Sequence, residues 1–145
     1  MKRILQTFFV ILVSFAVLAA CEDKEQTRRD ATVEVKKVMA KRKEAIETKN
    51  IELYKSLILP EYDDGQSSYK EQVEYMQSLF ERYESIQFTY QKSMVDLKMN
   101  SARMVGKISY KPKGAEKATW NHEVTLFRRV DGKWFISGGV NLGLI

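Results

Sequence analysis

The hydrophobic pattern of this chain changes its period once, near residue 84, and this change restricts the fold more than any other feature. Before it, apolar side chains recur at helical spacing, and after it they alternate as they do in half-buried strands. Helices that precede a run of strands favour an α+β domain in which the helices pack on one face of the sheet. We therefore expect three N-terminal helices packed on a curved, mainly antiparallel sheet of about four strands.

The helical part contains three segments, each with its own signal. Asn50 is a suitable N-cap for a short helix that stops before Pro60. Ser68 and Glu71 form the pattern of a capping box, which predicts a helix from Tyr69 to Tyr83. The first helix is expected over residues 31–49, where an apolar stripe about 120° wide is formed by Val35, Val38, Met39, Ala45 and Ile46.

Four segments of alternating pattern follow, at residues 86–99, 102–111, 118–130 and 133–140. Asp131-Gly132 separates the last two, and this dipeptide between apolar runs is a strong signal for a two-residue hairpin turn. Such a turn pairs Phe127 with Ile136 across the hairpin.

The first residues are typical of a secretory signal. Lys2 and Arg3 precede an apolar run from Phe8 to Val17, whose length of about ten residues fits the roughly 7–15 of a signal peptide. A helix that spans a membrane needs about 20 apolar residues, so a spanning helix is the less favoured alternative.

Leu18-Ala19-Ala20-Cys21 directly follows this run and contains the single cysteine of the chain. The tetrapeptide resembles the lipobox of bacterial lipoproteins. The resemblance implies that the thiol of Cys21 receives a diacylglycerol, that the signal is cut before Cys21 and that the new amine is acylated. We expect a lipoprotein signal peptide at residues 1–20, a tether at 21–30 and a single α+β domain at 31–145. Two or more acyl chains make such an anchor stable.

Anchoring and composition limit the partners of the domain. The full chain carries 24 basic and 19 acidic side chains, and loss of residues 1–20 lowers the formal net charge from +5 to +3. These charges are interleaved and export separates the protein from nucleic acid, so we expect none as a partner. Gram-negative lipoproteins with aspartate after the cysteine are retained at the inner membrane, whereas this chain has Glu22 and then Asp23. We therefore expect an outer-membrane protein facing the periplasm if the cell is Gram-negative.

The order of elements resembles the nuclear-transport-factor-2-like superfamily, also called cystatin-like. The segments that carry the resemblance are the helix pair "AIETKNIELYKSLILPEY" and the closing hairpin "VTLFRRVDGKWFISGG". The resemblance implies a cone-shaped fold around a cavity. This fold also houses ketosteroid isomerases and polyketide cyclases, and many members dimerise through their sheets.

Side-chain alternation gives the closing hairpin two faces. We assign to the helices the face that is apolar for longer, which carries Trp120, His122, Val124, Leu126 and Phe135. The opposite face then exposes Phe127, Trp134 and Ile136, and we expect a homodimer through this cluster, because large exposed apolar patches usually mark interaction surfaces. Alternatively, the C-terminal "VNLGLI" folds back over the cluster.

Arg42 falls within the apolar stripe of the first helix. A buried, unpaired guanidinium would be very costly. Three solutions are open: the side chain reaches out to solvent, it pairs with a carboxylate such as Asp96, or it meets an anionic ligand in a cavity.

His122 is the only histidine. The face assignment places it with Trp120, Tyr90 and Arg42 as candidates to line a ligand cavity, although a hydrogen-bonded core or rim histidine is the simpler interpretation. One histidine without a second ligand makes no metal site, and no cofactor motif is present. We expect a non-enzymatic domain that binds a small ligand or an envelope protein. The alternative is a small isomerase, dehydratase or hydrolase using Asp96, His122 and a tyrosine.

Overall fold

The computed structural model describes residues 2–140, and it describes side chains for residues 25–91 and 93–140. The chain divides into two units, residues 1–33 and 34–145, and each is described by itself. Helix α1 begins at Lys2 and ends at Glu47, so the expected tether at 21–30 is helical. The predicted lipobox, including Cys21, lies outside the described side chains. In the part of the chain with described side chains, no helix is both long and apolar enough to cross a bilayer.

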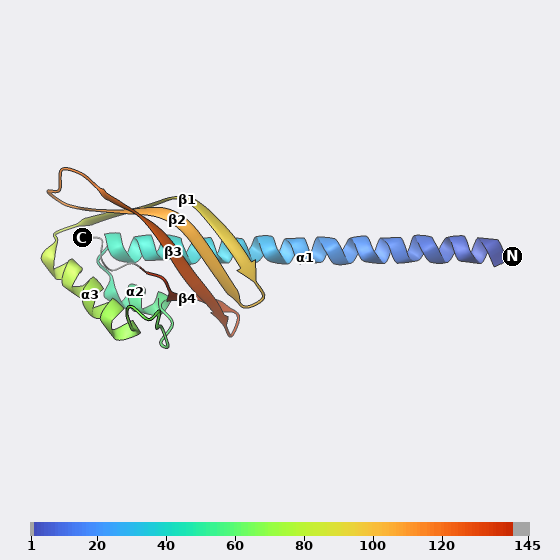
Figure 1. Ribbon diagram of the computed structural model, residues 1–145, viewed down its shortest axis with the longest axis horizontal. Coiled ribbons are helices and arrows are strands. Elements are labelled where there is room, and N and C mark those ends of the chain that lie inside the picture. Colours follow the sequence, from blue (N-terminus) through green and yellow to red (C-terminus); the bar gives the residue numbers. More distant parts are fainter. Residues whose placement is uncertain (1, 141–145) are drawn as a thin grey trace. The chain divides into compact units, whose positions relative to one another are not determined.

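Helices α2 (Ile51–Leu57) and α3 (Tyr69–Arg82) begin at the predicted caps (Figure 1). The Asn50 side chain accepts a hydrogen bond from the backbone N–H of Leu53 at 2.9 Å. Ser68 and Glu71 form a complete capping box, because each side chain accepts a hydrogen bond from the backbone N–H of the other. Both caps satisfy amide groups that have no partner within the helix.

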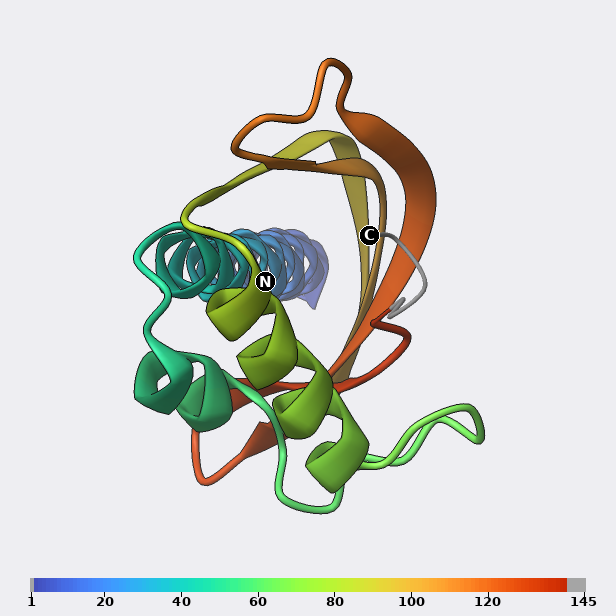
Figure 2. The ribbon, with the colours of Figure 1, turned by 90° about the vertical axis from the view of Figure 1, so that its left-hand side faces the viewer.

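Strands β1 (Ile86–Lys98), β2 (Ser101–Pro112), β3 (Thr119–Val130) and β4 (Lys133–Gly138) form one antiparallel sheet. Their order in the sheet is their order in the chain. The turn between β3 and β4 has positive φ angles at Asp131 (47°) and Gly132 (79°), as the type I′ turn requires. The expected α+β architecture is therefore confirmed: over residues 2–140, three helices lie on a four-stranded, unclosed sheet. Figure 2 shows the sheet curving around the helices of the second unit.

The outer edge of β4 is partly covered by the segment that follows α2. Ile58 forms an isolated parallel bridge with Ile136, and the backbone N–H of Leu59 donates to the carbonyl of Ile136 at 2.8 Å. This contact fixes the end of α2 against the last strand.

Asp64, in the loop between α2 and α3, fastens the C-terminal end of β4. Its Oδ2 accepts hydrogen bonds from the Tyr62 hydroxyl at 2.7 Å and from the backbone N–H of Gly139 at 3.0 Å. Its Oδ1 accepts from the backbone N–H groups of Gln66 and Ser67. One carboxylate thereby joins the loop to the chain after β4.

The core lies between the helices and one face of the sheet. Helix α1 contributes the predicted stripe, all of which is buried, and α3 contributes Met76, Leu79 and Phe80. The facing side of the sheet contributes Phe88, Ala102, Met104, Ile108, Tyr110, Phe127, Trp134 and Ile136.

This core overturns the predicted face assignment of β3. The inward face carries Glu123, Thr125 and Phe127, which are buried, whereas His122 and Leu126 are exposed. The count of apolar residues favoured the wrong face because the inward face contains two polar residues whose hydrogen bonds are made inside the protein. Since side chains alternate along a strand, one wrong assignment moves every residue of the strand to the other face.

Candidate functional site

Arg42 lies on α1 with a fully buried side chain (0 % exposed) and contacts the inward face of the sheet. Its two terminal nitrogens bind the two carboxylate oxygens of Glu123 on β3, Nη1 to Oε1 and Nη2 to Oε2 at 3.1 Å. Nη2 also donates to the Tyr110 hydroxyl at 3.0 Å. Of the three solutions left open by the sequence, the internal ion pair is the observed one. The partner is Glu123 and not Asp96, because Asp96 lies on the opposite face of the sheet.

The carboxylate of Glu123 is engaged on both oxygens. The Thr125 hydroxyl donates to Oε1 at 2.7 Å, in addition to the two bonds from the guanidinium. The guanidinium carbon of Arg42 lies over the Phe88 ring, 5.2 Å from its centroid. A carboxylate bound in this way is a poor general base, because taking up a proton would break a charge-assisted hydrogen bond.

Burial and charge shift the pKa of Arg42 and of the two tyrosines beside it, Tyr54 and Tyr110. Burial alone would lower the pKa of Arg42, but the carboxylate of Glu123 outweighs this effect and the pKa is raised. Burial raises the pKa of Tyr54 and Tyr110 well above the usual value, against the opposing effect of the Arg42 charge. Both phenols are therefore neutral at physiological pH. Among the described residues, the Nε of Arg42 has no hydrogen-bond partner, so it is a free donor.

The residues predicted to line a cavity do not lie together. Arg42, on α1, faces the sheet, and the half-buried Tyr90 lies on the inward face of β1, where its ring is 6.4 Å from that of Phe88. His122 and Trp120 lie on the outer face. Trp120 is 39 % exposed there, and the ammonium of Lys107 lies over its ring in a cation–π contact. Their predicted place in an internal cavity is wrong for the reason that the β3 face was misassigned.

The predicted catalytic set is not assembled either. Asp96 is exposed on β1, opposite Arg103 in the strand register, and the exposed His122 on β3 is opposite Lys107 on β2. Both side chains point away from the buried tyrosines. An enzyme built on Asp96, His122 and an internal tyrosine is therefore excluded by the strand register.

The predicted dimer face is also corrected. Phe127, Trp134 and Ile136 are 1 %, 7 % and 0 % exposed, respectively, because they form the core against the helices. They cannot form a surface between two copies. The exposed apolar residues of the sheet lie on the other face and include Met94, Trp120 and Leu126.

A groove of about 330 Å³ lies between α1, α2 and the start of β4. Its apolar surface comes from three buried residues, Val38, Leu57 and Trp134. Its rim is lined by three lysines, Lys37, Lys41 and Lys133. Sequence reasoning missed this groove. Two features of the sequence were its only signal. Basic residues flank the apolar stripe of the first helix, and two adjacent aromatic residues, Trp134 and Phe135, follow the hairpin turn.

A second pocket, of about 420 Å³, lies at one end of the outer sheet face. Its charged lining consists of Asp96, Lys98, Arg103 and Arg128, with Leu126 as an apolar neighbour. It is more polar than the groove. Within the described part of the chain, no group of three or more His, Cys, Asp or Glu side chains is arranged to hold a metal ion.

Comparison with known proteins identifies the fold and nothing narrower. No protein-family model matches this chain, and no curated protein is similar to it in sequence. Among solved structures, it is similar to a protein of unknown function with a cystatin-like fold from Nostoc punctiforme (TM-score 0.62, 10 % identity, 73 % of this chain and 85 % of that one).

Two other structures are similar to the same extent. One is a putative dehydratase of the NTF2-like family from Streptomyces avermitilis (TM-score 0.62, 16 % identity, 73 % of this chain and 90 % of that one). The other is a putative scytalone dehydratase from Novosphingobium aromaticivorans (TM-score 0.65, 10 % identity, 77 % of this chain and 83 % of that one). The domain therefore has the NTF2-like, or cystatin-like, fold.

Proposed function

We propose that this protein is a lipid-anchored, non-enzymatic binding domain of the bacterial cell envelope. The anchor is supported by the sequence Leu18-Ala19-Ala20-Cys21 directly after an apolar run. The binding role is compatible with the fold, whose solved examples include proteins of unknown function as well as putative dehydratases.

The observation that carries the non-enzymatic role is the buried pair of Arg42 and Glu123. Glu123 is the only carboxylate among the buried residues of the described core, and both of its oxygens are occupied by the guanidinium and by Thr125. Acid–base catalysis needs a group that can exchange protons with substrate near the working pH. Glu123 serves instead to neutralise Arg42.

A dehydratase or isomerase is the alternative, and one observation favours it. The Tyr110 hydroxyl accepts from Arg42 and keeps its own O–H as a donor, and the Nε–H of Arg42 is a second donor, without a partner among the described residues. Two such donors could stabilise a developing oxyanion. This alternative still lacks a base.

Anchoring is tested by metabolic labelling of cells with a clickable palmitate analogue. We expect label on the wild-type chain and on a Glu22→Gln control, and none on Cys21→Ser, which should also remain uncleaved. Separation of inner and outer membranes then locates the protein, with the outer membrane expected. Labelling of Cys21→Ser at the wild-type level would rule out this anchor.

Binding without turnover is tested by native mass spectrometry of the full chain released gently from its membrane. We expect a reproducible small-molecule adduct that is recovered chemically unchanged after incubation with the protein. Recovery of a product one water molecule lighter, with loss of this conversion in Tyr110→Phe, would instead establish the dehydratase.

A further inference from the structure

The groove between α1, α2 and β4 combines an apolar floor with a positively charged rim. Its floor is formed by side chains that the core holds in place: Val38, Leu57 and Trp134 are all less than 10 % exposed, and the half-buried Leu53 and Phe135 extend this surface. A volume of about 330 Å³ is at the lower end of the range for small-molecule sites.

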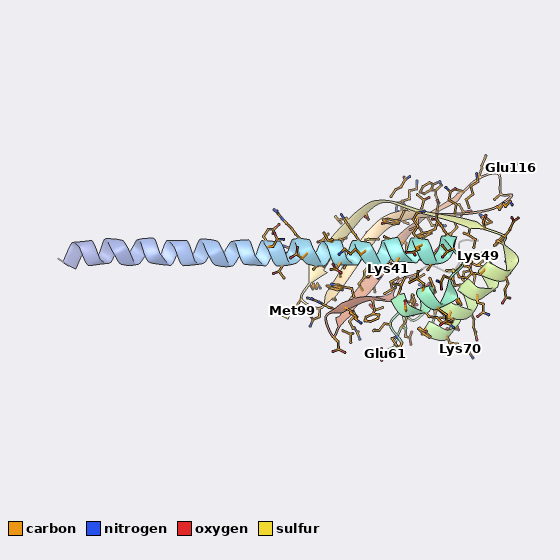
Figure 3. The ribbon with its side chains drawn as sticks, turned by 180° about the vertical axis from the view of Figure 1, so that it is seen from behind. Lys41, Lys49, Glu61, Lys70, Met99 and Glu116 are labelled. Carbon is orange, nitrogen blue, oxygen red and sulfur yellow. The ribbon has the colours of Figure 1, made fainter. Side chains whose placement is uncertain are left out.

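Lysine side chains surround this floor. The side chains of Lys41 on α1, labelled in Figure 3, and Lys133 on β4 are exposed and form no hydrogen bond or ion pair with any described residue. Lys37 is also on the rim, where it pairs with Glu34 at 2.7 Å. The rim therefore carries three ammonium groups against one carboxylate, and two of the ammonium groups are not neutralised by the described part of the protein.

The edge of β4 adds a directional donor. In the antiparallel sheet, backbone groups point alternately to the two sides of a strand. The carbonyl of Ile136 points to the outer edge, where it accepts from Leu59, so the N–H and C=O of Trp134, two residues earlier, point to the same edge. The described pairing of this edge is confined to residues 58 and 59, and Trp134 itself lines the groove.

We propose that this groove binds a small amphipathic anion, namely a free carboxylate with an aliphatic or aromatic body. The apolar body would lie on the floor around Trp134 and Leu57. The carboxylate would lie between Lys41 and Lys133, within reach of the backbone N–H of Trp134. This inference rests on the proposed binding function and specifies its site and the class of its ligand.

The test uses octanoate as the probe and the full chain in nanodiscs of phosphatidylcholine, with empty discs as the blank. Isothermal titration calorimetry compares octanoate with 1-octanol and octyltrimethylammonium, which have the same aliphatic body but a neutral or positive head. We expect octanoate to bind and the other two to bind at least about tenfold more weakly, because only the carboxylate is attracted by the lysines.

Matched lysine variants then locate the site. Lys41→Gln/Lys133→Gln should weaken octanoate binding about tenfold, the effect of losing two partly exposed charge contacts. The control Lys70→Gln/Lys117→Gln removes two exposed lysines that do not line the groove and should leave the affinity unchanged. Circular dichroism checks that both variants are folded. Discs containing phosphatidylglycerol reveal competition by anionic lipid as weaker octanoate binding.

Equal affinity for octanoate and octyltrimethylammonium, or equal effects of the two lysine pairs, would overturn the proposed groove. Absence of octanoate binding would also overturn it, and the proposed function would stand if native mass spectrometry still recovered an unchanged ligand. Conversion of the recovered ligand would instead overturn the proposed function.

Discussion

Arg42 and Glu123 are 81 residues apart in the sequence and form a two-pronged ion pair across the centre of the domain, with both side chains buried. The pair joins α1 to the inward face of β3. Taking two charges out of water is costly, so such a pair gives little net stability while both members are present. Each member alone, however, would be an unpaired buried charge.

Removing one member should therefore be far more damaging than removing both. We expect Arg42→Met or Glu123→Gln to lower the free energy of unfolding by about 3–5 kcal/mol. The double variant Arg42→Met/Glu123→Leu should recover most of this loss or exceed the wild type. Urea denaturation followed by circular dichroism measures all three. The exposed pair Glu52 and Lys55 is the control, and Lys55→Met should cost less than about 1 kcal/mol. Additive losses in the double variant would contradict a coupled pair.

The two tryptophans test the corrected faces of the hairpin. Trp134 is buried against the helices and Trp120 is 39 % exposed on the outer face. Trp134→Ala should cost about 3–5 kcal/mol, because it opens a cavity in the core. Trp120→Ala should cost about 1 kcal/mol at most, mainly through its contact with Lys107. Thermal unfolding of the two variants side by side would refute the observed faces if Trp120→Ala were the more damaging.

Gly139 and Gly65 have the same backbone φ of 77° but different surroundings. A Cβ on Gly139 would lie 1.8 Å from the carbonyl oxygen of Val124, whereas a Cβ on Gly65 would meet nothing within 4 Å. Gly65→Ala should cost about 1–2 kcal/mol, the usual penalty of a left-handed conformation. Gly139→Ala should cost clearly more, since the end of β4 must move away from β3. Equal urea midpoints for the two variants would mean that this close approach has no effect on stability.

The N-cap of α3 should make a small contribution to the free energy of unfolding that a single substitution can measure. Ser68→Ala removes the side-chain oxygen that accepts from the Glu71 N–H and should cost about 1 kcal/mol. Ser101→Ala, at an exposed strand position, is the matched control and should be nearly neutral. Differential scanning calorimetry resolves this difference, and an unchanged melting temperature in Ser68→Ala would show that the capping box is dispensable.

Asp64 should make the stability of the fold depend on pH in the acidic range. Burial alone would raise the pKa of Asp64, but hydrogen bonds from the Tyr62 hydroxyl and from the backbone of Gln66, Ser67 and Gly139 outweigh this and lower it. A carboxyl whose pKa is lower in the folded state stabilises the fold above its unfolded pKa, about 4, and loses this contribution as the pH falls through the folded pKa.

Asp64→Asn should therefore be less stable than the wild type at pH 7, and the deficit should shrink below about pH 4. Urea unfolding at several pH values measures the deficit. The pKa of Glu71 is also lowered, through hydrogen bonds from the backbone and side chain of Ser68. Glu71 is present in both proteins, so its contribution cancels in the difference between their stabilities. Glu61→Gln, an exposed control labelled in Figure 3, should be nearly as stable as the wild type at pH 7. A deficit that stays constant from pH 7 to acid would exclude Asp64 as the titrating group.

Local sequence signals predicted the elements well because the chemistry that forms them is local. Asn50, the Ser68–Glu71 box and the Asp131-Gly132 turn each act within a few residues of their position, and each is where the sequence placed it. The helical stripe containing Val35 and Ile46 is buried as expected. These features define the α+β class without knowledge of any long-range contact.

The site depended on long-range pairing and could not be predicted in the same way. Arg42 could be recognised as a buried cation in need of an anion, but Asp96 and Glu123 were equally suitable by composition. Only the three-dimensional pairing turns Glu123 inward, and with it Phe127. A rule that matches each buried cation with an inward carboxylate before counting apolar residues would have found the correct face of β3.

The meander order of the strands has a consequence for how the chain acquires its structure during synthesis. Strands that are neighbours in the sheet are also neighbours in the sequence. Each hairpin can therefore form as soon as it leaves the ribosome, because closing its short loop costs little entropy. The helices come first, yet their apolar faces are covered only once Phe127, Trp134 and Ile136 have been made. We expect the nascent chain to lack a stable core until β4 is complete, and to fold cooperatively at that point.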